Sequence, residues 1–122
     1  MKVLVLASSS RYRQAQLQTL GLPFRCVAPD IDESPQSGES ASALAARLAA
    51  GKARAVAARF PAALVIGSDQ TVEFGEQILG KPGSLEAAVR QLQALRGHSV
   101  VFHSALALLD TANDSLQCDM IT

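Results

Sequence analysis

The sequence predicts an α/β fold, in which buried strands alternate with helices along the chain. Apolar runs at 3–7 and 64–68 have the length and composition of buried strands. Helical patterns at 10–20 and 40–59 separate them. The second run stops at a small residue and is followed directly by Asp69. Ligands of open α/β sheets bind beyond the carboxyl ends of the strands. Asp69 is therefore a candidate functional residue, the alternative being a turn-capping aspartate.

Composition favours a single globular domain over residues 1–122. The chain has 122 residues, 48% of them hydrophobic and 18% charged, which is typical of one compact core. Eleven Lys and Arg balance eleven Asp and Glu, so no global field attracts a nucleic acid polymer or an anionic membrane. Neither a signal peptide nor a membrane-spanning stretch is evident, so we expect a cytoplasmic protein.

The first helix follows a serine-rich loop. Ser10 can cap this helix, which glycine ends at position 21. Helix N-terminal amides, the hydroxyls of Ser8 and Ser10, and the guanidinium of Arg13 together suit an anion such as phosphate. The alternative is a plain N-cap with arginines at the surface.

An acidic loop at 28–39 follows a short strand predicted at 24–27. Its carboxylates include Asp30, Asp32 and Glu33. They either face solvent or hold a divalent cation through oxygen ligands, and spacing alone does not decide between these.

The helix at 40–59 is rich in alanine. Leu44 and Leu48 mark its buried stripe, and Lys52 lies on the same i, i+4 row. We expect the Lys52 amine to point along this stripe toward the interior or a cleft, the alternative being a side chain that snorkels to the rim.

The second half of the chain predicts a hairpin with strands at 71–74 and 77–79, then a helix at 84–95. A long strand at 99–109 and a returning strand at 116–121 follow. The chain ends within that last strand, so we expect a sheet that is incomplete at its C-terminus and exposes a strand edge.

The histidines and cysteines give no catalytic or metal-binding motif. His98 and His103 lack a paired nucleophile, and we interpret both as structural. Cys26 and Cys118 have neither zinc spacing nor a disulfide framework, so we expect structural, reduced thiols.

Five ordered segments resemble the Maf nucleotide pyrophosphatases. These segments are Ala7-Ser-Ser-Ser-Arg-Tyr-Arg13, Asp32-Glu33, Arg47-Leu-Ala-x-x-Lys52-Ala, Gly67-Ser-Asp-Gln70 and Gly80-Lys-Pro82. The resemblance implies a mixed, twisted sheet flanked by helices, as in Maf and ITPase-like proteins, and a family chain that continues well beyond residue 122. It implies hydrolysis of a nucleoside triphosphate to the monophosphate and pyrophosphate, with Mg²⁺ or Mn²⁺ as cofactor.

The resemblance also assigns roles to individual residues. Asp69 is implied as the proton acceptor and, with Glu33, as a metal ligand. The triphosphate would be bound by serines and cations, namely Ser8, Ser10, Arg13, Lys52 and Lys81. Tyr12 and Gln70 match the branch that hydrolyses 7-methyl-GTP, whose cationic base gains from stacking on an aromatic ring; Tyr12 could instead be a half-buried helix residue.

Two alternatives stay open at this level. One is a dTTP or UTP pyrophosphatase, and the other is a nucleotide-binding or regulatory remnant without turnover. The exposed last strand and the family resemblance also suggest a homodimer.

Overall fold

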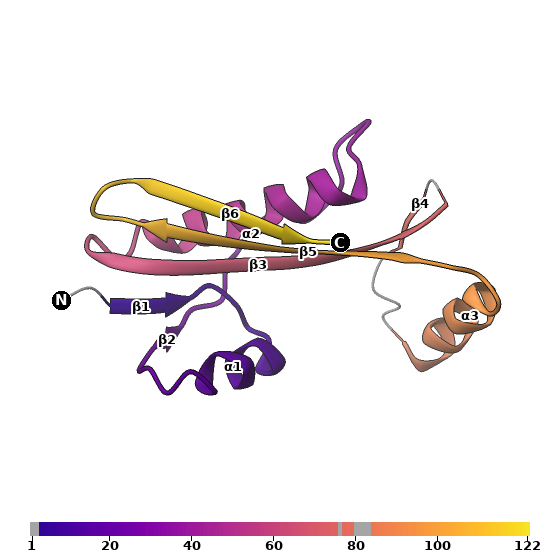
Figure 1. Cartoon of the computed structure of the whole chain (residues 1–122), viewed down its shortest axis with the longest axis horizontal. Helices are drawn as coiled ribbons and strands as arrows, with labels where there is room; N and C mark the ends of the chain where they lie inside the picture. The colour runs from indigo at the N-terminus through magenta and orange to yellow at the C-terminus, as the bar shows by residue number, and fades with distance from the viewer. Residues whose placement is uncertain (1–2, 76, 80–83) are drawn as a thin grey trace.

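The computed structural model describes residues 3–75, 77–79 and 84–122, which form a twisted mixed sheet with helices on both sides (Figure 1). The strands are β1 (Val3–Leu6), β2 (Arg25–Cys26), β3 (Ala63–Phe74), β4 (Gln77–Leu79), β5 (Val101–Asp110) and β6 (Ser115–Ile121). The helices are α1 (Arg11–Gln18), α2 (Ala41–Ala57) and α3 (Leu85–Leu95). The predicted α/β fold class is confirmed, and most element boundaries lie within two residues of the prediction.

The sheet has the strand order β2-β1-β3-β5-β6, and β4 pairs with the far end of β3. β1 is parallel to both β2 and β3, whereas β3, β5 and β6 form antiparallel pairs. The sheet is therefore mixed. Its parallel part consists of β1, β2 and the start of β3, and the hairpins β3–β4 and β5–β6 are antiparallel.

The predicted break in the strand at residue 68 is wrong, because β3 continues without interruption from Ala63 to Phe74. β5 pairs with it along its length, from Leu64 to Glu73, and supplies partners for the polar stretch around Asp69. Asp69 therefore lies in the middle of a strand. The strand that ends near Asp69 is β1, whose last pair joins Leu6 to Ile66.

This difference creates a gap beside β3, which we call the notch. On the side of β3 that faces away from β5, β1 pairs as far as Ile66 and β4 pairs from Val72 onward. In the described part of the chain, no strand lies alongside residues 67–71 on that side. The notch places Asp69 at an open edge in the centre of the sheet.

Helix α2 covers one face of the sheet and forms the core with it. Its buried row contains Leu44, Leu48, Lys52 and Val56, as the sequence pattern predicts. The facing side chains of β3 and β5 alternate buried with less buried, and the most enclosed of them include Val65 and Leu109. Ser40 caps the helix by accepting the Ala43 amide hydrogen, at 3.1 Å.

The other face of the sheet is only partly covered. Helix α1 lies on that side, below β1 and β2 in Figure 1, and has no buried residue. Helix α3 sits beyond the far end of the sheet and leaves Leu85 and Leu92 82% and 70% exposed. These two leucines of α3 thus face solvent in the described structure.

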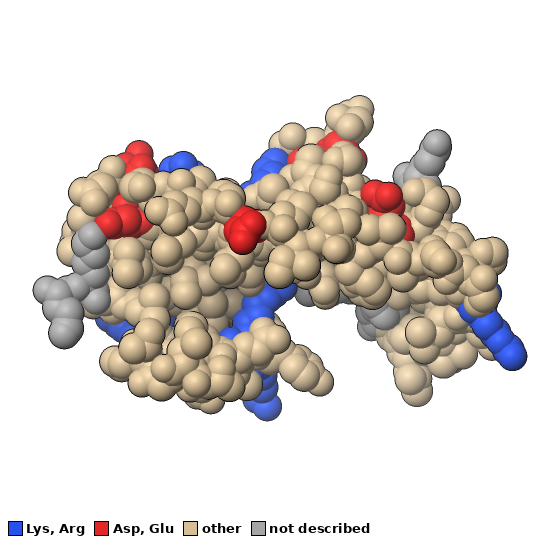
Figure 2. Space-filling model, viewed as in Figure 1, with Lys and Arg blue, Asp and Glu red and all other residues tan. Residues whose placement is uncertain are grey.

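The surface seen in Figure 2 carries scattered charges of both signs separated by wide uncharged areas. This agrees with the balanced composition of the chain. Among the described residues, no helix is long and apolar enough to cross a membrane. Cys26 and Cys118 are free, as predicted, but both are exposed and are not core residues.

Candidate functional site

A buried lysine joins two carboxylates beside the notch. The Lys52 Nζ lies 3.0 Å from Asp69 Oδ1 and 3.1 Å from Glu33 Oε1. It also approaches the Ser68 carbonyl oxygen at 3.4 Å. The side chains of Lys52 and Asp69 are 9% and 10% exposed, whereas Glu33 is 53% exposed. One ammonium therefore binds a buried carboxylate and an accessible one, at the boundary between core and solvent.

The cluster follows from how α2 and β3 pack together. Lys52 lies on the buried row of α2, and odd-numbered residues of β3 face that helix. Gly67 allows the close approach, because a Cβ there would overlap the Ala49 carbonyl oxygen and lie 2.9 Å from the Ala53 nitrogen. The lysine amine consequently reaches Asp69, which lies two residues after Gly67 on β3.

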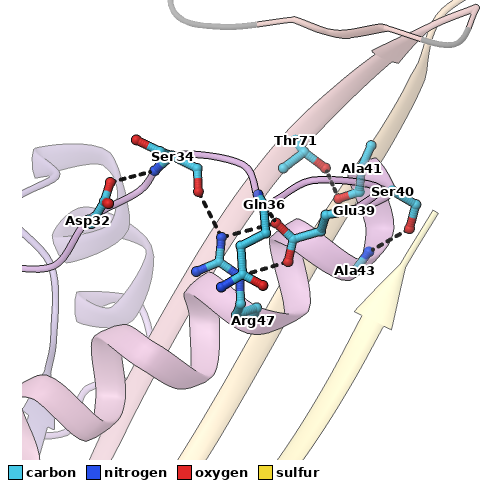
Figure 3. Close-up of polar contacts among 9 residues, drawn as sticks. All are labelled: Asp32, Ser34, Gln36, Glu39, Ser40, Ala41, Ala43, Arg47 and Thr71. Carbon is cyan, nitrogen blue, oxygen red and sulfur yellow. Dashed lines mark hydrogen bonds and ion pairs between the residues drawn. The ribbon is translucent and has the colours of Figure 1, made fainter.

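The acidic loop is held in place by Arg47 of α2 (Figure 3). Its guanidinium donates to the two carboxylate oxygens of Glu39, at 2.7 and 3.0 Å, and to the Ser34 carbonyl at 2.9 Å. The Asp32 carboxylate accepts the Ser34 amide hydrogen at 2.9 Å. These contacts fix the residues on both sides of Glu33 and so position its carboxylate toward Lys52.

The electrostatics of this loop agree with its hydrogen bonds. The Arg47 guanidinium, by hydrogen bonding, holds the pKa of Glu39 below its ordinary value, and Glu39 in turn raises the pKa of Arg47. Hydrogen bonds from Ser34 lower the pKa of Asp32. Sequence reasoning gave Glu39 no role. The sequence signal for this pair is the acidic residue Glu39 eight positions before Arg47 of the helix.

The serine loop runs from the end of β1, beside the notch, to the start of α1. Ser8 is buried, and its hydroxyl oxygen accepts the Ser10 amide hydrogen at 3.0 Å. Ser10 caps α1 as predicted, accepting the Arg13 amide hydrogen at 3.4 Å. The positive end of α1 therefore lies at the carboxyl end of β1, where an anion gains from the helix dipole.

Between α1 and the less covered face of the sheet is an open cavity of about 910 Å³. Its lining includes most of the predicted binding residues, together with others from β5 and β6: Ser10, Tyr12, Arg13, Asp69, Gln70, Ser104, Leu106, Asp119 and Ile121. Even-numbered residues of β3 face this cavity, whereas Lys52 and Glu33 lie on the α2 side. The two groups of predicted residues meet at Asp69 in the notch.

The two predicted specificity residues line the same cavity. Tyr12 is 86% exposed on the first turn of α1, so it is not the half-buried helix residue of the alternative interpretation. Gln70 projects from β3, and its Nε2 donates to the Ser104 hydroxyl at 3.1 Å. Ser104, which sequence reasoning missed, thereby orients the Gln70 amide within the cavity.

The carboxylates of Glu33 and Asp69 are oxygen donors of the kind that a divalent cation binds. Both converge on the single point where the Lys52 ammonium lies, and carboxylate oxygens are the ligands that Mg²⁺ prefers, usually one or two together with water. The described residues contain no cluster of three or more His, Cys, Asp or Glu side chains around one point. Any ion would therefore have an open coordination sphere and would compete with Lys52.

The remaining candidates lie elsewhere. His103 is buried, contacts Thr122 at 3.2 Å and lies 3.5 Å from Glu73, in agreement with a structural role. His98 stacks edge-on against Phe74. Lys81, predicted to bind the triphosphate, lies outside the described residues.

The fold is that of an α/β protein whose cavity is lined by the start of α1, an arginine and an aspartate, and that aspartate pairs with a buried lysine on the α2 side. Comparison with known families makes this specific. Residues 3–121 match the family described as Maf-like protein. The chain belongs to this family.

Curated relatives are about half identical to this chain over the aligned residues. The 7-methyl-GTP pyrophosphatase of Burkholderia orbicola is 53% identical over 121 residues, which cover 97% of this chain and 58% of the relative. Its counterparts in Bordetella avium and Pseudomonas fluorescens are each 52% identical, with 60% and 63% of the relative covered. The chain thus spans about three fifths of the length of these relatives.

Among solved structures, the Staphylococcus aureus Ham1 protein has a similar fold, with a TM-score of 0.63 and 18% sequence identity. The match covers 98% of this chain and 68% of that one. It supports the same architecture of a mixed sheet flanked by helices.

Proposed function

We propose that this protein is a nucleoside triphosphate pyrophosphatase that acts on 7-methyl-GTP, releasing the monophosphate and pyrophosphate. The observation that carries the proposal is the position of Asp69, which is paired with Lys52 and lines the same cavity as Ser10 and Arg13. The names of the relatives in Burkholderia, Bordetella and Pseudomonas support the same reaction and substrate.

In the proposed reaction, water attacks the α-phosphorus of the bound triphosphate. A bond forms between the water oxygen and phosphorus, the bond from phosphorus to the α–β bridging oxygen breaks, and pyrophosphate leaves. The water proton passes to Asp69, which acts as general base. Ser8, Ser10 and Arg13 bind phosphate oxygens, and Lys81 would add a further cation. Lys52 orients Asp69 through their 3.0 Å contact, and it offers positive charge to the phosphates.

A divalent cation, Mg²⁺ or Mn²⁺, would be held by Glu33 and Asp69, whose oxygens already converge on Lys52. When bound, the ion supplies Lewis acidity and lowers the pKa of water. This matters because an aspartate with a pKa of about 4 is a weak base for water at neutral pH. Arg47 then acts indirectly, since it holds the loop that presents Glu33.

The cavity between α1 and the sheet would take the nucleoside. Tyr12 is exposed and free to stack on the base, and a cationic 7-methylguanine adds a cation–π contribution of roughly 0.5–2 kcal/mol. Gln70, held by Ser104, would meet the edge of the base. These two residues favour 7-methyl-GTP over dTTP or UTP.

A second candidate is a protein that binds the nucleotide without hydrolysing it. The contact of 3.0 Å between Lys52 and Asp69 favours this alternative, because the ammonium already occupies one of the two carboxylate oxygens that could accept the water proton. A homodimer and a cytoplasmic location stay predictions. We expect no nucleic acid polymer or membrane as partner.

The test combines pyrophosphate release with calorimetric binding, using 7-methyl-GTP, GTP, dTTP and UTP in the presence of Mg²⁺ or Mn²⁺. We expect release to be fastest from 7-methyl-GTP. Asp69→Asn should reduce release by on the order of 10²–10⁴-fold and spare binding. The matched control, Asp114→Asn in the β5–β6 turn, should leave both unchanged.

Two outcomes would contradict the pyrophosphatase proposal. Binding of nucleotide by the wild type without release under any of these conditions would select the binding-only alternative. Absence of both binding and release would reject the nucleotide site altogether. Circular dichroism of Asp69→Asn should confirm that this variant is folded.

A further inference from the structure

The charged residues lining the large cavity are divided between its two sides. Three of the described lining residues are charged, namely Arg13, Asp69 and Asp119. Asp69 already pairs with Lys52 on the α2 side. Arg13 follows the serine loop at the start of α1, whereas Asp119 belongs to β6, two strands away from β3. The cavity therefore has a cation beside the serine loop and an anion at a distant position on β6.

Strand register places Asp119 on the cavity floor. Ser68 of β3 pairs with Leu106 of β5, which pairs with Asp119 of β6, so the three side chains point to one face. Two strand spacings separate the backbones of β3 and β6 by about 10 Å. The neighbouring row contains Gln70, Ser104 and Ile121. A flat base about as wide as a purine can therefore lie over Leu106 between Gln70 and Asp119.

Asp119 has one carboxylate oxygen available for a ligand. Its Oδ1 accepts the Met120 amide hydrogen at 2.9 Å, a local contact that fixes the side chain. The Oδ2 atom makes no hydrogen bond or ion pair within the described ranges 3–75, 77–79 and 84–122. Asp114, on the same hairpin, lies instead at the turn and 3.5 Å from Arg54.

We propose that Asp119 is a specificity-determining residue that attracts the positively charged ring of a 7-methylated purine. This rests on the proposed function and adds to it. N7-methylation makes guanine cationic, and a triphosphate is anionic, so the substrate has opposite charges at its two ends. Arg13 and Asp119 complement that polarity across an apolar floor. Unmethylated GTP lacks the cationic ring and therefore lacks this charge attraction, so Asp119 selects for the methyl group through its charge.

The test measures dissociation constants of 7-methyl-GTP and GTP for the wild type, Asp119→Asn and Asp119→Glu. The asparagine keeps an oxygen for the Met120 amide and replaces the charged carboxylate by a neutral amide of the same shape. We expect the preference for 7-methyl-GTP to fall by about tenfold in Asp119→Asn, which corresponds to 1.4 kcal/mol. Asp119→Glu should retain most of the preference. Asp114→Asn is the matched control and should retain all of it.

The outcomes separate this inference from the function on which it rests. An unchanged ratio of the two dissociation constants in Asp119→Asn, in a chain that binds both nucleotides, would overturn the role of Asp119 and leave the proposed function intact. Equal weakening for both nucleotides would also overturn it, because that would indicate a general effect on the cavity. A wild type that binds neither nucleotide would reject both proposals.

Discussion

Gly67 of β3 lies against Ala49 of α2 so closely that a side chain on the glycine would overlap the Ala49 carbonyl oxygen. Alanine is found again at Ala45 and Ala53 on the same helix, and both are fully buried. Small residues on both elements therefore bring helix and strand together. This contact determines the position along β3 at which the Lys52 amine meets Asp69.

The first prediction concerns this contact. Gly67→Ala should strongly destabilise the protein, because the added Cβ meets backbone atoms that cannot move without displacing α2. We expect a loss of at least about 2 kcal/mol in the free energy of unfolding, measured with urea.

Gly51→Ala is the control, since its Cβ would meet only the Ile31 Cδ1 atom, at 3.4 Å. It lies inside α2, where alanine is favoured over glycine by up to about 1 kcal/mol. Equal losses in the two variants would contradict the close-packing explanation.

The second prediction is that Lys52 and Asp69 are energetically coupled. Lys52→Met leaves a buried carboxylate without its cation and should cost about 3–5 kcal/mol. Adding Asp69→Asn to that variant should cost much less than Asp69→Asn does alone, because the charge that needed a partner is gone. A double-mutant cycle of urea unfolding measures the coupling, and strict additivity of the two changes would argue against the pair.

The third prediction is a pH dependence that comes from Glu39. Its pKa is lowered in the folded state by Arg47, so its contribution to stability is present above the unfolded carboxyl pKa of about 4.3. That contribution is lost as the pH falls through the lower, folded-state pKa. Glu39→Gln should therefore destabilise the protein at pH 7, and the difference from wild type should shrink in acid.

Thermal unfolding of both proteins between pH 7 and pH 2 checks this. Glu86→Gln removes a more exposed carboxylate, 3.6 Å from Arg90 on α3, and should have a smaller effect. A destabilisation by Glu39→Gln that stays constant down to the lowest pH would mean that the Arg47 pair is not its cause.

The fourth prediction compares two leucines. Leu48 on α2 is 4% exposed, and Leu48→Ala should cost about 2–5 kcal/mol. Leu92 on α3 is 70% exposed, and Leu92→Ala should change the free energy of unfolding by no more than about 0.5 kcal/mol. Chemical denaturation measures both, and a large loss for Leu92→Ala would show that α3 is packed in solution.

The local parts of the fold were accessible from the sequence because neighbouring residues determine them. The buried row of α2 repeats every four residues, and Ser10, Ser40 and Ser84 each stand directly before a helix that they cap. The predicted break in β3 is wrong because residues far away in the sequence determine this part of the strand. Ser68 and Gln70 look like a strand end, but pairing with β5, more than thirty residues away, keeps this polar stretch in the sheet.

The residues of the site also fall into those that the local sequence predicts and those that depend on distant parts of the chain. The direction of Lys52 follows from its place on the α2 row, and the structure brings it to Asp69 and Glu33. The ion pair between Arg47 and Glu39 depends on the path of a loop, and no repeating pattern in the sequence predicts that path. Asp119 belongs to the cavity only because β6 returns beside β5, so its place depends on register between strands.

The notch has a consequence for the exchange of backbone hydrogens with water. The Ile66 carbonyl accepts the Ala7 amide hydrogen, at 2.8 Å, so even-numbered residues of β3 point their backbone groups toward the side of β1. Beyond the end of β1, the amides of Ser68 and Gln70 therefore face the gap, while those of Gly67 and Asp69 point to β5. We expect deuterium to enter at Ser68 and Gln70 far faster than at their immediate neighbours. A phosphate seated in the notch would slow that entry, so this alternation within one strand reports directly on ligand occupancy.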